Sequence, residues 1–385
     1  MSVIRSVIFS SVCLLVILIQ GCNRNKSIHT GNTGITKSNP LFAGLFSIDH
    51  TDSCIIVSIN NPWQGADNVR FSYCLIKRGM KIPAGYDSSD VIFIPLRKII
   101  CMSTTHLAMV SALGEESSIV GISGKDYIYS ASIRRMIEHD SVKDVGYDTN
   151  INKEMIIDLD PDLIMMYGIG SESAAYVGRL RELGIKVAFD AEYLENNPLA
   201  RAEWIKVFGA LFCREALADS IFRAEVDSYN SIKNFIASNI SHRPAVLLGL
   251  PFKDTWYISP GNSYMSKLIS DAGGSYLWKD NKSATAVPMG IENVFVKAMS
   301  ANYWLNTGSA SSRKEIALVD RRFEDLNCYI NDNIYNNDNR TTKKGGNDYW
   351  ENGILHPHII LNDIACVLHP ELFHNYSLVY YRRIR

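Results

Sequence analysis

The polar run Ser103-Thr104-Thr105-His106 holds side chains that are well placed to meet a ligand. It follows the apolar stretch 98–102 and precedes an apolar run with helical spacing, so we expect it where a strand ends and a helix begins. Free backbone N–H groups at a helix start favour anionic ligand groups, although ordinary capping explains the same pattern. The imidazole of His106 could coordinate the metal of a bound ligand, or could simply be packed or solvated.

Aromatic, amide and hydroxyl side chains and one lysine, near other predicted strand ends and turns, form a second group of ligand candidates. Aromatic rings give a flat ligand apolar contact, and polar groups orient it. Each member has an alternative role in the core or at the rim of a domain. The group consists of Lys125, Tyr127, Tyr167, Trp256, Tyr257, Asn262, Ser263, Trp278 and Trp350.

Sequence motifs for catalysis or for metal binding fail at their key positions. Segment 121–126 lacks the spacing and the final Ser or Thr of a phosphate-binding loop, and no Gly-x-Ser-x-Gly motif occurs. His356 and His358 flank a proline with no further ligand nearby in the sequence. The polar segment 331–346 lacks the glycine and final glutamate of a calcium loop. We therefore predict no catalytic residues, no metal site and no cofactor.

Strand and helix patterns indicate how these residues are positioned. A β-hairpin is expected over 54–76, and strand and helix patterns then alternate from 98 to 189, which favours a parallel sheet of βα units. Residues 198–238 keep a helical spacing and predict one long connecting helix, or two with a bend near Cys213. The alternation then restarts, with a polar loop over 331–346, a helix over 358–368 and a last strand over 378–381.

These patterns predict an α/β fold of two lobes, each with a central, mostly parallel sheet flanked by helices, joined by a long rigid interdomain helix. The predicted division is an N-terminal lobe with the hairpin over 46–195, a connecting helix over 196–240 and a C-terminal lobe over 241–385. Ligands of such proteins bind in the cleft between the lobes, at the strand ends.

The N-terminus has the pattern of an export signal. Arg5 precedes the short apolar run 7–19, and the stretch from Leu18 to Cys22 is similar to the lipobox of bacterial lipoproteins. This similarity implies cleavage of residues 1–21 and a lipid on Cys22 as membrane anchor, with an uncleaved anchor helix as the alternative. Residues 23–40 are rich in Asn, Lys, Ser, Thr and Gly, and we predict a flexible tether over 22–45. The absence of an acidic residue directly after Cys22 favours the periplasmic side of a bacterial membrane.

Charge and cysteine usage narrow the class of protein further. The formal net charge is −1, so nothing in the charge balance indicates a partner such as nucleic acid. The eight cysteines include no CxxC pair, which argues against a metal site. Cys54 and Cys74 lie on two neighbouring predicted strands and either pair in an oxidising compartment or stay as buried free thiols.

Several segments, in order, resemble the substrate-binding proteins of iron-siderophore, haem and vitamin B12 ABC importers. The resemblance covers most of residues 97–373 and implies the two-lobed fold. It departs from the family pattern at the N-terminal hairpin and at the strand that begins near Ala301, and both departures weaken any inference about the ligand. The segments are 97–114 with 119–123, 154–163, 183–187, 208–216, 263–274, 291–295 and 368–373.

The resemblance also implies a function: capture of an iron complex (ferric siderophore or haem) or a corrinoid, and delivery to an ABC permease and its ATPase. In this family one glutamate at a helix start on each lobe docks onto permease arginines, and Glu154 and Glu292 stand at the matching positions. The alternative is that both merely complement a helix dipole. We expect a monomer that is not an enzyme; a non-transport surface lipoprotein and a chelatase-like enzyme on the same scaffold are the alternatives.

Overall fold

The computed structural model describes residues 36–88, 91–147, 150–168, 170 and 172–385. The predicted signal segment, Cys22 and the first part of the predicted tether lie outside these residues. Within the described ranges, none of the helices combines the length and the apolar character that a membrane span needs.

The first part of the described chain forms a five-stranded sheet in the order β1-β2-β3-β4-β5. The predicted hairpin is confirmed, because β3 and β4 pair antiparallel in register along their lengths. The hairpin cysteines, Cys54 and Cys74, are free thiols. The strands are β1 (Thr36–Ser38), β2 (Phe46–His50), β3 (Ile55–Asn60), β4 (Arg70–Lys77) and β5 (Val91–Ile94).

The predicted βα alternation is confirmed by a second sheet, whose strands run parallel in the order β10-β9-β6-β7-β8. Its central strands are buried along almost their whole length, as expected for a parallel sheet covered on both faces. The strands are β6 (Ile99–Cys101), β7 (Ile119–Ile122), β8 (Lys143–Asp144), β9 (Leu163–Tyr167) and β10 (Val187–Asp190). The helices between them are α1 (Thr104–Ala112), α2 (Ala131–Glu138), α3 (Lys153–Leu159) and α4 (Glu172–Glu182).

The C-terminal lobe has a third sheet in the order β13-β11-β15-β16-β17, parallel except for the last pair. A separate antiparallel pair, β12 with β14, accompanies it. The strands are β11 (Ala245–Leu248), β12 (Thr255–Ile258), β13 (Ser275–Tyr276), β14 (Val287–Gly290), β15 (Tyr303–Leu305), β16 (Ile334–Asn336) and β17 (Arg382–Arg383). The helices are α8 (Tyr264–Asp271), α9 (Ile291–Ala298), α10 (Arg313–Val319), α11 (Asn327–Ile330), α12 (Asp348–Glu351) and α13 (Pro357–Leu368).

Two predictions for this lobe are wrong. The segment 331–346 is not only a polar loop, because it contains β16, and the last strand is β17 rather than 378–381. Asn336, in β16, is buried and donates to Gly308 O (2.8 Å), and the exposed Asn339 donates to Val379 O (3.0 Å). A strand of three residues between such side chains carries no periodic apolar signal.

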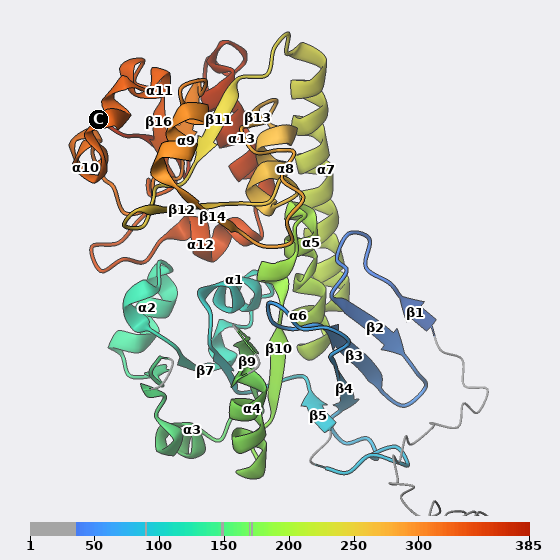
Figure 1. The fold of residues 1–385 in the computed structure, drawn as a ribbon. Coiled ribbons are helices and arrows are strands. Elements are labelled where there is room, and N and C mark those ends of the chain that lie inside the picture. The colour runs from blue at the N-terminus through green and yellow to red at the C-terminus, as the bar shows by residue number, and fades with distance from the viewer. Residues whose placement is uncertain (1–35, 89–90, 148–149, 169, 171) are drawn as a thin grey trace, which may run out of the picture. The chain divides into compact units, whose positions relative to one another are not determined.

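The run 198–238 divides into three helices, α5 (Pro198–Glu203), α6 (Ile205–Leu211) and α7 (Glu215–Asn239). The bend considered near Cys213 is confirmed, because Cys213 has a positive φ of 55° and α7 begins two residues later. At about 1.5 Å per residue, the 25 residues of α7 extend over roughly 37 Å. Figure 1 shows α7 running alongside both lobes.

Side chains of α7 belong to the hydrophobic cores of both lobes. Ala218 and Phe222, in its first half, lie in the core of the N-terminal lobe. Tyr229 and Ile236, in its second half, lie in the core of the C-terminal lobe, and Val226 packs against both cores. The lobes are therefore connected by packing as well as by the chain.

The end of the predicted tether is fixed to the N-terminal lobe. Backbone N–H groups of 41–43 donate to the carboxylate of Glu203 at 2.7–3.0 Å, and those of 44–45 donate to Glu195 at 2.9–3.0 Å. Both carboxylates are buried, and Lys206 pairs with Glu203 at 2.9 Å. Residues 39–45 are consequently part of the fold and not of a flexible tether.

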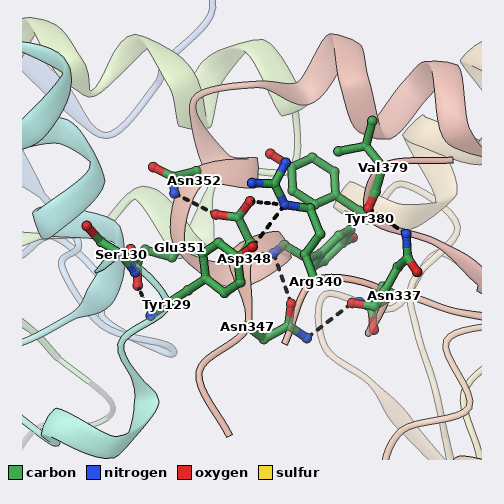
Figure 2. Close-up of polar contacts among 12 residues, drawn as sticks. Tyr129, Ser130, Asn337, Arg340, Asn347, Asp348, Glu351, Asn352, Val379 and Tyr380 are labelled. Atoms are coloured by element: carbon green, nitrogen blue, oxygen red, sulfur yellow. Dashed lines mark hydrogen bonds and ion pairs between the residues drawn. The ribbon is translucent and has the colours of Figure 1, made fainter. Parts of the chain in front are cut away.

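Glu351 of α12 joins the two lobes directly (Figure 2). Its carboxylate oxygens accept the backbone N–H groups of Tyr129 (2.7 Å) and Ser130 (2.9 Å), at the start of α2 in the other lobe. Glu351 is only 1% exposed, and burial raises the pKa of its carboxyl to about 7 even though both N–H groups favour the ionised form. Asp348 lies close enough to raise this pKa further.

Replacing Glu351 should change how stability depends on pH. The pKa is about 7 in the folded protein and near the ordinary 4.5 when exposed, so the folded state binds the extra proton between these values. The contribution of the Glu351 carboxyl to the free energy of unfolding is thus complete below pH 4.5. It is lost as the pH rises through 7, which lowers the free energy of unfolding by roughly 3 kcal/mol at most. Glu351→Gln keeps the uncharged form, so its melting temperature should fall less than that of the wild type between pH 5 and 8.

Parallel melting curves of Glu351→Gln and the wild type across that pH range would contradict this role. Glu138→Gln, at the exposed end of α2, is the matched control and should follow the wild type.

Candidate functional site

A pocket of about 370 Å³ is lined by residues of both lobes. On the N-terminal side it lies where three parallel strands end: Ser103 follows β6, Tyr167 ends β9, and Glu192 follows β10. The carboxyl ends of parallel strands are the usual position of ligand sites in such sheets. The lining residues are Ser103, Thr104, Thr105, Tyr167, Glu192, Tyr193, Arg201, Tyr264, Tyr349, Trp350 and Ile354.

The predicted run at the start of α1 caps the helix and also lines the pocket. Ser103 Oγ accepts the backbone N–H of Thr105 at 3.3 Å, and the two hydroxyls lie 2.8 Å apart. The hydroxyl of Thr105 also hydrogen-bonds to Glu192 and opposes the rise in its pKa. The first turn of α1 therefore presents hydroxyl groups to the pocket from a fixed position.

Arg201 of α5 is the positively charged residue of the pocket wall. Its Nε donates to Glu195 O (2.8 Å) and its Nη2 to Tyr193 O (2.6 Å), while its guanidinium lies 4.1 Å from the centre of the Tyr264 ring. Burial raises the pKa of Glu192, and the charge of Arg201 opposes that rise only in part. The positive charge of Arg201 is fixed, and the ionised form of the neighbouring Glu192 is disfavoured. The pocket therefore suits a neutral or anionic ligand better than a cationic one.

Aromatic side chains form the wall contributed by the C-terminal lobe. Trp350 is 56% exposed and packs edge-on against Tyr349, with ring centres 4.8 Å apart. The Tyr349 hydroxyl donates to Met265 Sδ at 3.2 Å, which fixes the orientation of its ring. The outer face of the Trp350 indole is exposed and can contact an apolar ligand surface.

His106 lies in the core and not on the pocket. It is the third residue of α1 and points toward the interior of the lobe, where it is 0% exposed. Its Nε2 is 3.4 Å from Asp190 Oδ2, and its ring packs near Phe208. Burial lowers the pKa of this imidazole to about 3. The expectation that His106 coordinates the metal of a bound ligand does not fit this position.

Lys125 and Tyr127 also lie outside the pocket. Lys125 lines a second, wider hollow of about 760 Å³ between segments 125–138 and 341–344. Tyr127 is 60% exposed and faces Tyr147.

The candidates from the C-terminal lobe, apart from Trp350, are not brought to the pocket either. Trp256 is fully buried and stacks on Trp304, whereas Tyr257, its neighbour on β12, is 57% exposed on the other face of the strand. Trp278 is buried beneath Lys297. Asn262 and Ser263 precede α8, which Ser263 caps.

Sequence reasoning missed six of the lining residues. Two had an available signal, because Tyr264 and Tyr349 are direct neighbours of the candidates Ser263 and Trp350. The other four had no such signal. Arg201 was one polar position in a run with helical spacing, and no motif marked Glu192, Tyr193 or Ile354. The missed residues are Glu192, Tyr193, Arg201, Tyr264, Tyr349 and Ile354.

The two glutamates proposed for docking occupy equivalent places in the two lobes. Glu154 is exposed in the first turn of α3, and Glu292 is exposed in the first turn of α9. The side chain of Glu292 is 76% exposed, with Arg322 Nη2 at 3.4 Å from Oε1. An ion pair this exposed contributes little and leaves the carboxylate available.

Solved structures with a similar fold come from solute-binding proteins. A possible iron-binding, periplasmic solute-binding protein from Staphylococcus epidermidis has a TM-score of 0.56 at 20% identity, covering 71% of this chain and 99% of its own. A periplasmic haem-binding protein from Pseudomonas aeruginosa has a TM-score of 0.56 at 15% identity, covering 75% of this chain and 98% of its own. These likenesses confirm the predicted two-lobed α/β fold.

Curated relatives and a family model complete the comparison. An uncharacterized lipoprotein from Methanocaldococcus jannaschii is 29% identical over 296 residues, which cover 74% of this chain and 68% of the relative. A second lipoprotein from the same organism is 24% identical and covers 83% of this chain and 82% of its own length. The family model described as periplasmic binding protein matches residues 99–341. This match, on a fold with a pocket between two lobes, shows that the chain belongs to the periplasmic binding protein family.

Proposed function

We propose that this protein captures an iron complex, a ferric siderophore or haem, in the pocket between its lobes and delivers it to an ABC permease. The observation that carries the proposal is a pocket whose walls come from both lobes of a periplasmic binding protein. A ligand that touches both walls is bound tightly only in one arrangement of the lobes, and a permease can recognise that arrangement.

The chemistry of the pocket supports a flat or aromatic ligand with anionic groups. Five of its eleven lining residues are aromatic, and Arg201 is held in place by two backbone carbonyls. Aromatic side chains pack on planar ligands, and a fixed guanidinium recognises carboxylate or other anionic oxygens. Proteins of similar fold that are described as iron-binding and haem-binding agree with this class of ligand.

The volume of the pocket favours the smaller ligands of the class. About 370 Å³ is near the lower end of the range of small-molecule sites. A corrinoid with its axial nucleotide is larger than haem and is the alternative cargo. We propose that the ligand leaves unchanged, because capture and release need no covalent step.

Export, anchoring and docking complete the proposed function. Two relatives are described as lipoproteins, which supports lipidation at Cys22 and a position on the outer side of a membrane. Glu154 and Glu292 place one exposed carboxylate on each lobe, which suits bidentate capture by permease arginines. The protein would work as a monomer bound to a permease and its ATPase.

A ligand screen with a Trp350 variant tests the pocket. Haemin, several ferric siderophores, cobinamide and cyanocobalamin are added to the purified protein, and the melting temperature is recorded. A ligand at 100 times its Kd adds about 2.7 kcal/mol of stability. Trp350→Ala removes an exposed aromatic wall and should weaken the binding of the active compound about tenfold, as measured by titration calorimetry.

Tyr257→Ala is the matched control for this variant, because Tyr257 is equally exposed but lies outside the pocket. It should bind like the wild type. Equal losses in both variants, or no stabilisation by any iron complex or corrinoid, would count against the proposed pocket.

A charge-reversal pair tests docking separately from binding. Glu154→Lys with Glu292→Lys should abolish ligand uptake by cells or by vesicles that contain the permease, because like charges would then face its arginines. Ligand affinity should stay within about twofold, since neither residue lines the pocket. Uptake of labelled ligand and calorimetric affinity are the two readouts.

Glu182→Lys with Glu324→Lys makes the same charge change at exposed positions of the two lobes and should leave uptake intact. Docking through Glu154 and Glu292 is refuted if both pairs reduce uptake equally or if the first pair transports normally.

A further inference from the structure

A cluster of side chains that can bind a metal ion lies outside the pocket, where α7 meets the start of α13. Glu225 comes from the middle of α7, His356 precedes α13 directly, and His358 is its second residue. One ligating atom of each lies within 4.8 Å of the other two. The two histidines appeared to have no further ligand in the sequence because Glu225 is more than 130 residues away.

The carboxylate of Glu225 is at the centre of this cluster. His358 Nδ1 lies 2.8 Å from Oε1 and 2.7 Å from Oε2, and His356 Nδ1 lies 3.7 Å from Oε2. Oε1 also accepts the backbone N–H of His358 at 2.8 Å. The side chain of Glu225 is 5% exposed, whereas those of His356 and His358 are 42% and 28% exposed. An ion could therefore reach the carboxylate from the side of the imidazoles.

The charge balance of the cluster suits a bound cation. Buried carboxylates are normally paired, yet no lysine or arginine in the described part of the chain lies within ion-pair distance of Glu225. Its side-chain partners are the imidazoles of His356 and His358. Imidazole and carboxylate groups are common metal ligands, and a metal ion would supply the positive charge that the carboxylate lacks.

We propose that Glu225, His356 and His358 bind one divalent transition-metal ion of the zinc class. Two imidazoles and one carboxylate are the protein ligands of open zinc sites, in which water takes the fourth position. Zinc bonds of about 2.0–2.2 Å in a tetrahedron place the ligand atoms roughly 3.4 Å apart. The separations of 2.7 and 3.7 Å from Oε2 bracket that value, and all three ligand atoms lie within 4.8 Å of one another, so side-chain rotations can bring them to tetrahedral positions.

An ion at this position would join the helix shared by both lobes to the wall of the pocket. α13 follows directly on the segment that contains Trp350 and Ile354, both of which line the pocket. α7 contributes side chains to both cores. The metal would thus fix the C-terminal wall of the pocket to α7, whether or not a ligand is bound.

Zinc titration of the metal-free full chain, without an affinity tag, tests the proposal. Calorimetry and metal analysis should show saturable binding of one Zn²⁺ per chain. His356→Gln and His358→Gln should each weaken this binding by at least about tenfold, because each removes one of three ligands. His374→Gln, at an exposed position outside the cluster, should bind zinc like the wild type.

The histidine variants decide the outcome even if Glu225→Gln does not fold, since both imidazoles are partly exposed. No saturable zinc binding would overturn the proposal and leave a simple hydrogen bond between His358 and Glu225. Equal zinc affinity in all three histidine variants would overturn it as well. Trp350→Ala should keep its zinc binding, so failure of the proposed ligand pocket would be distinguished from failure of the metal site.

Discussion

The packing of α7 into both hydrophobic cores is the constraint on which the rest of the structure depends. Phe222 belongs to one core and Tyr229 to the other, although they are only two turns apart on the same helix. Moving the lobes far apart would remove one of these large side chains from its core, which costs several kcal/mol. The lobes can therefore rock about α7, but they cannot open widely without losing core packing.

This constraint also limits how far the two walls of the pocket can move relative to each other. Strand ends and α1 position the hydroxyls of one wall, and α8 and α12 position the aromatic side chains of the other. Between them Glu351 holds the lobes together through two backbone N–H groups at the start of α2. Walls restrained in this way reduce the entropic cost of binding and restrict ligand-dependent motion to small changes in the angle between the lobes.

Much of the fold could be predicted from the sequence because its periodic patterns are strong. The hairpin and the βα units of the N-terminal lobe have apolar strands bounded by turns. The bend near Cys213, just before α7 begins, was one of the two alternatives for the helical run 198–238. β16 could not be predicted, because it is short and asparagines in it and just after it bond to backbone carbonyls from distant segments. Local pattern carries no information about such partners.

The site was predictable only in part, for the same reason. The polar run at a strand end predicted that residues 103–105 line the pocket, and they do. His106, in the same run, points into the core, because successive side chains of a helix are turned by about 100°. Arg201 and Glu192 contribute charge to the pocket through tertiary contacts that no sequence spacing reveals. Glu225 and His358 are likewise brought together only by the packing of α7 against α13.

Hydrogen–deuterium exchange with and without the proposed iron complex tests the central claim most directly, that the ligand is held between both lobes. The structure predicts added protection in three separate segments that line the pocket, 103–105, 192–201 and 349–354. Protection confined to one lobe, or to the hollow formed by 125–138 and 341–344, would contradict the claim.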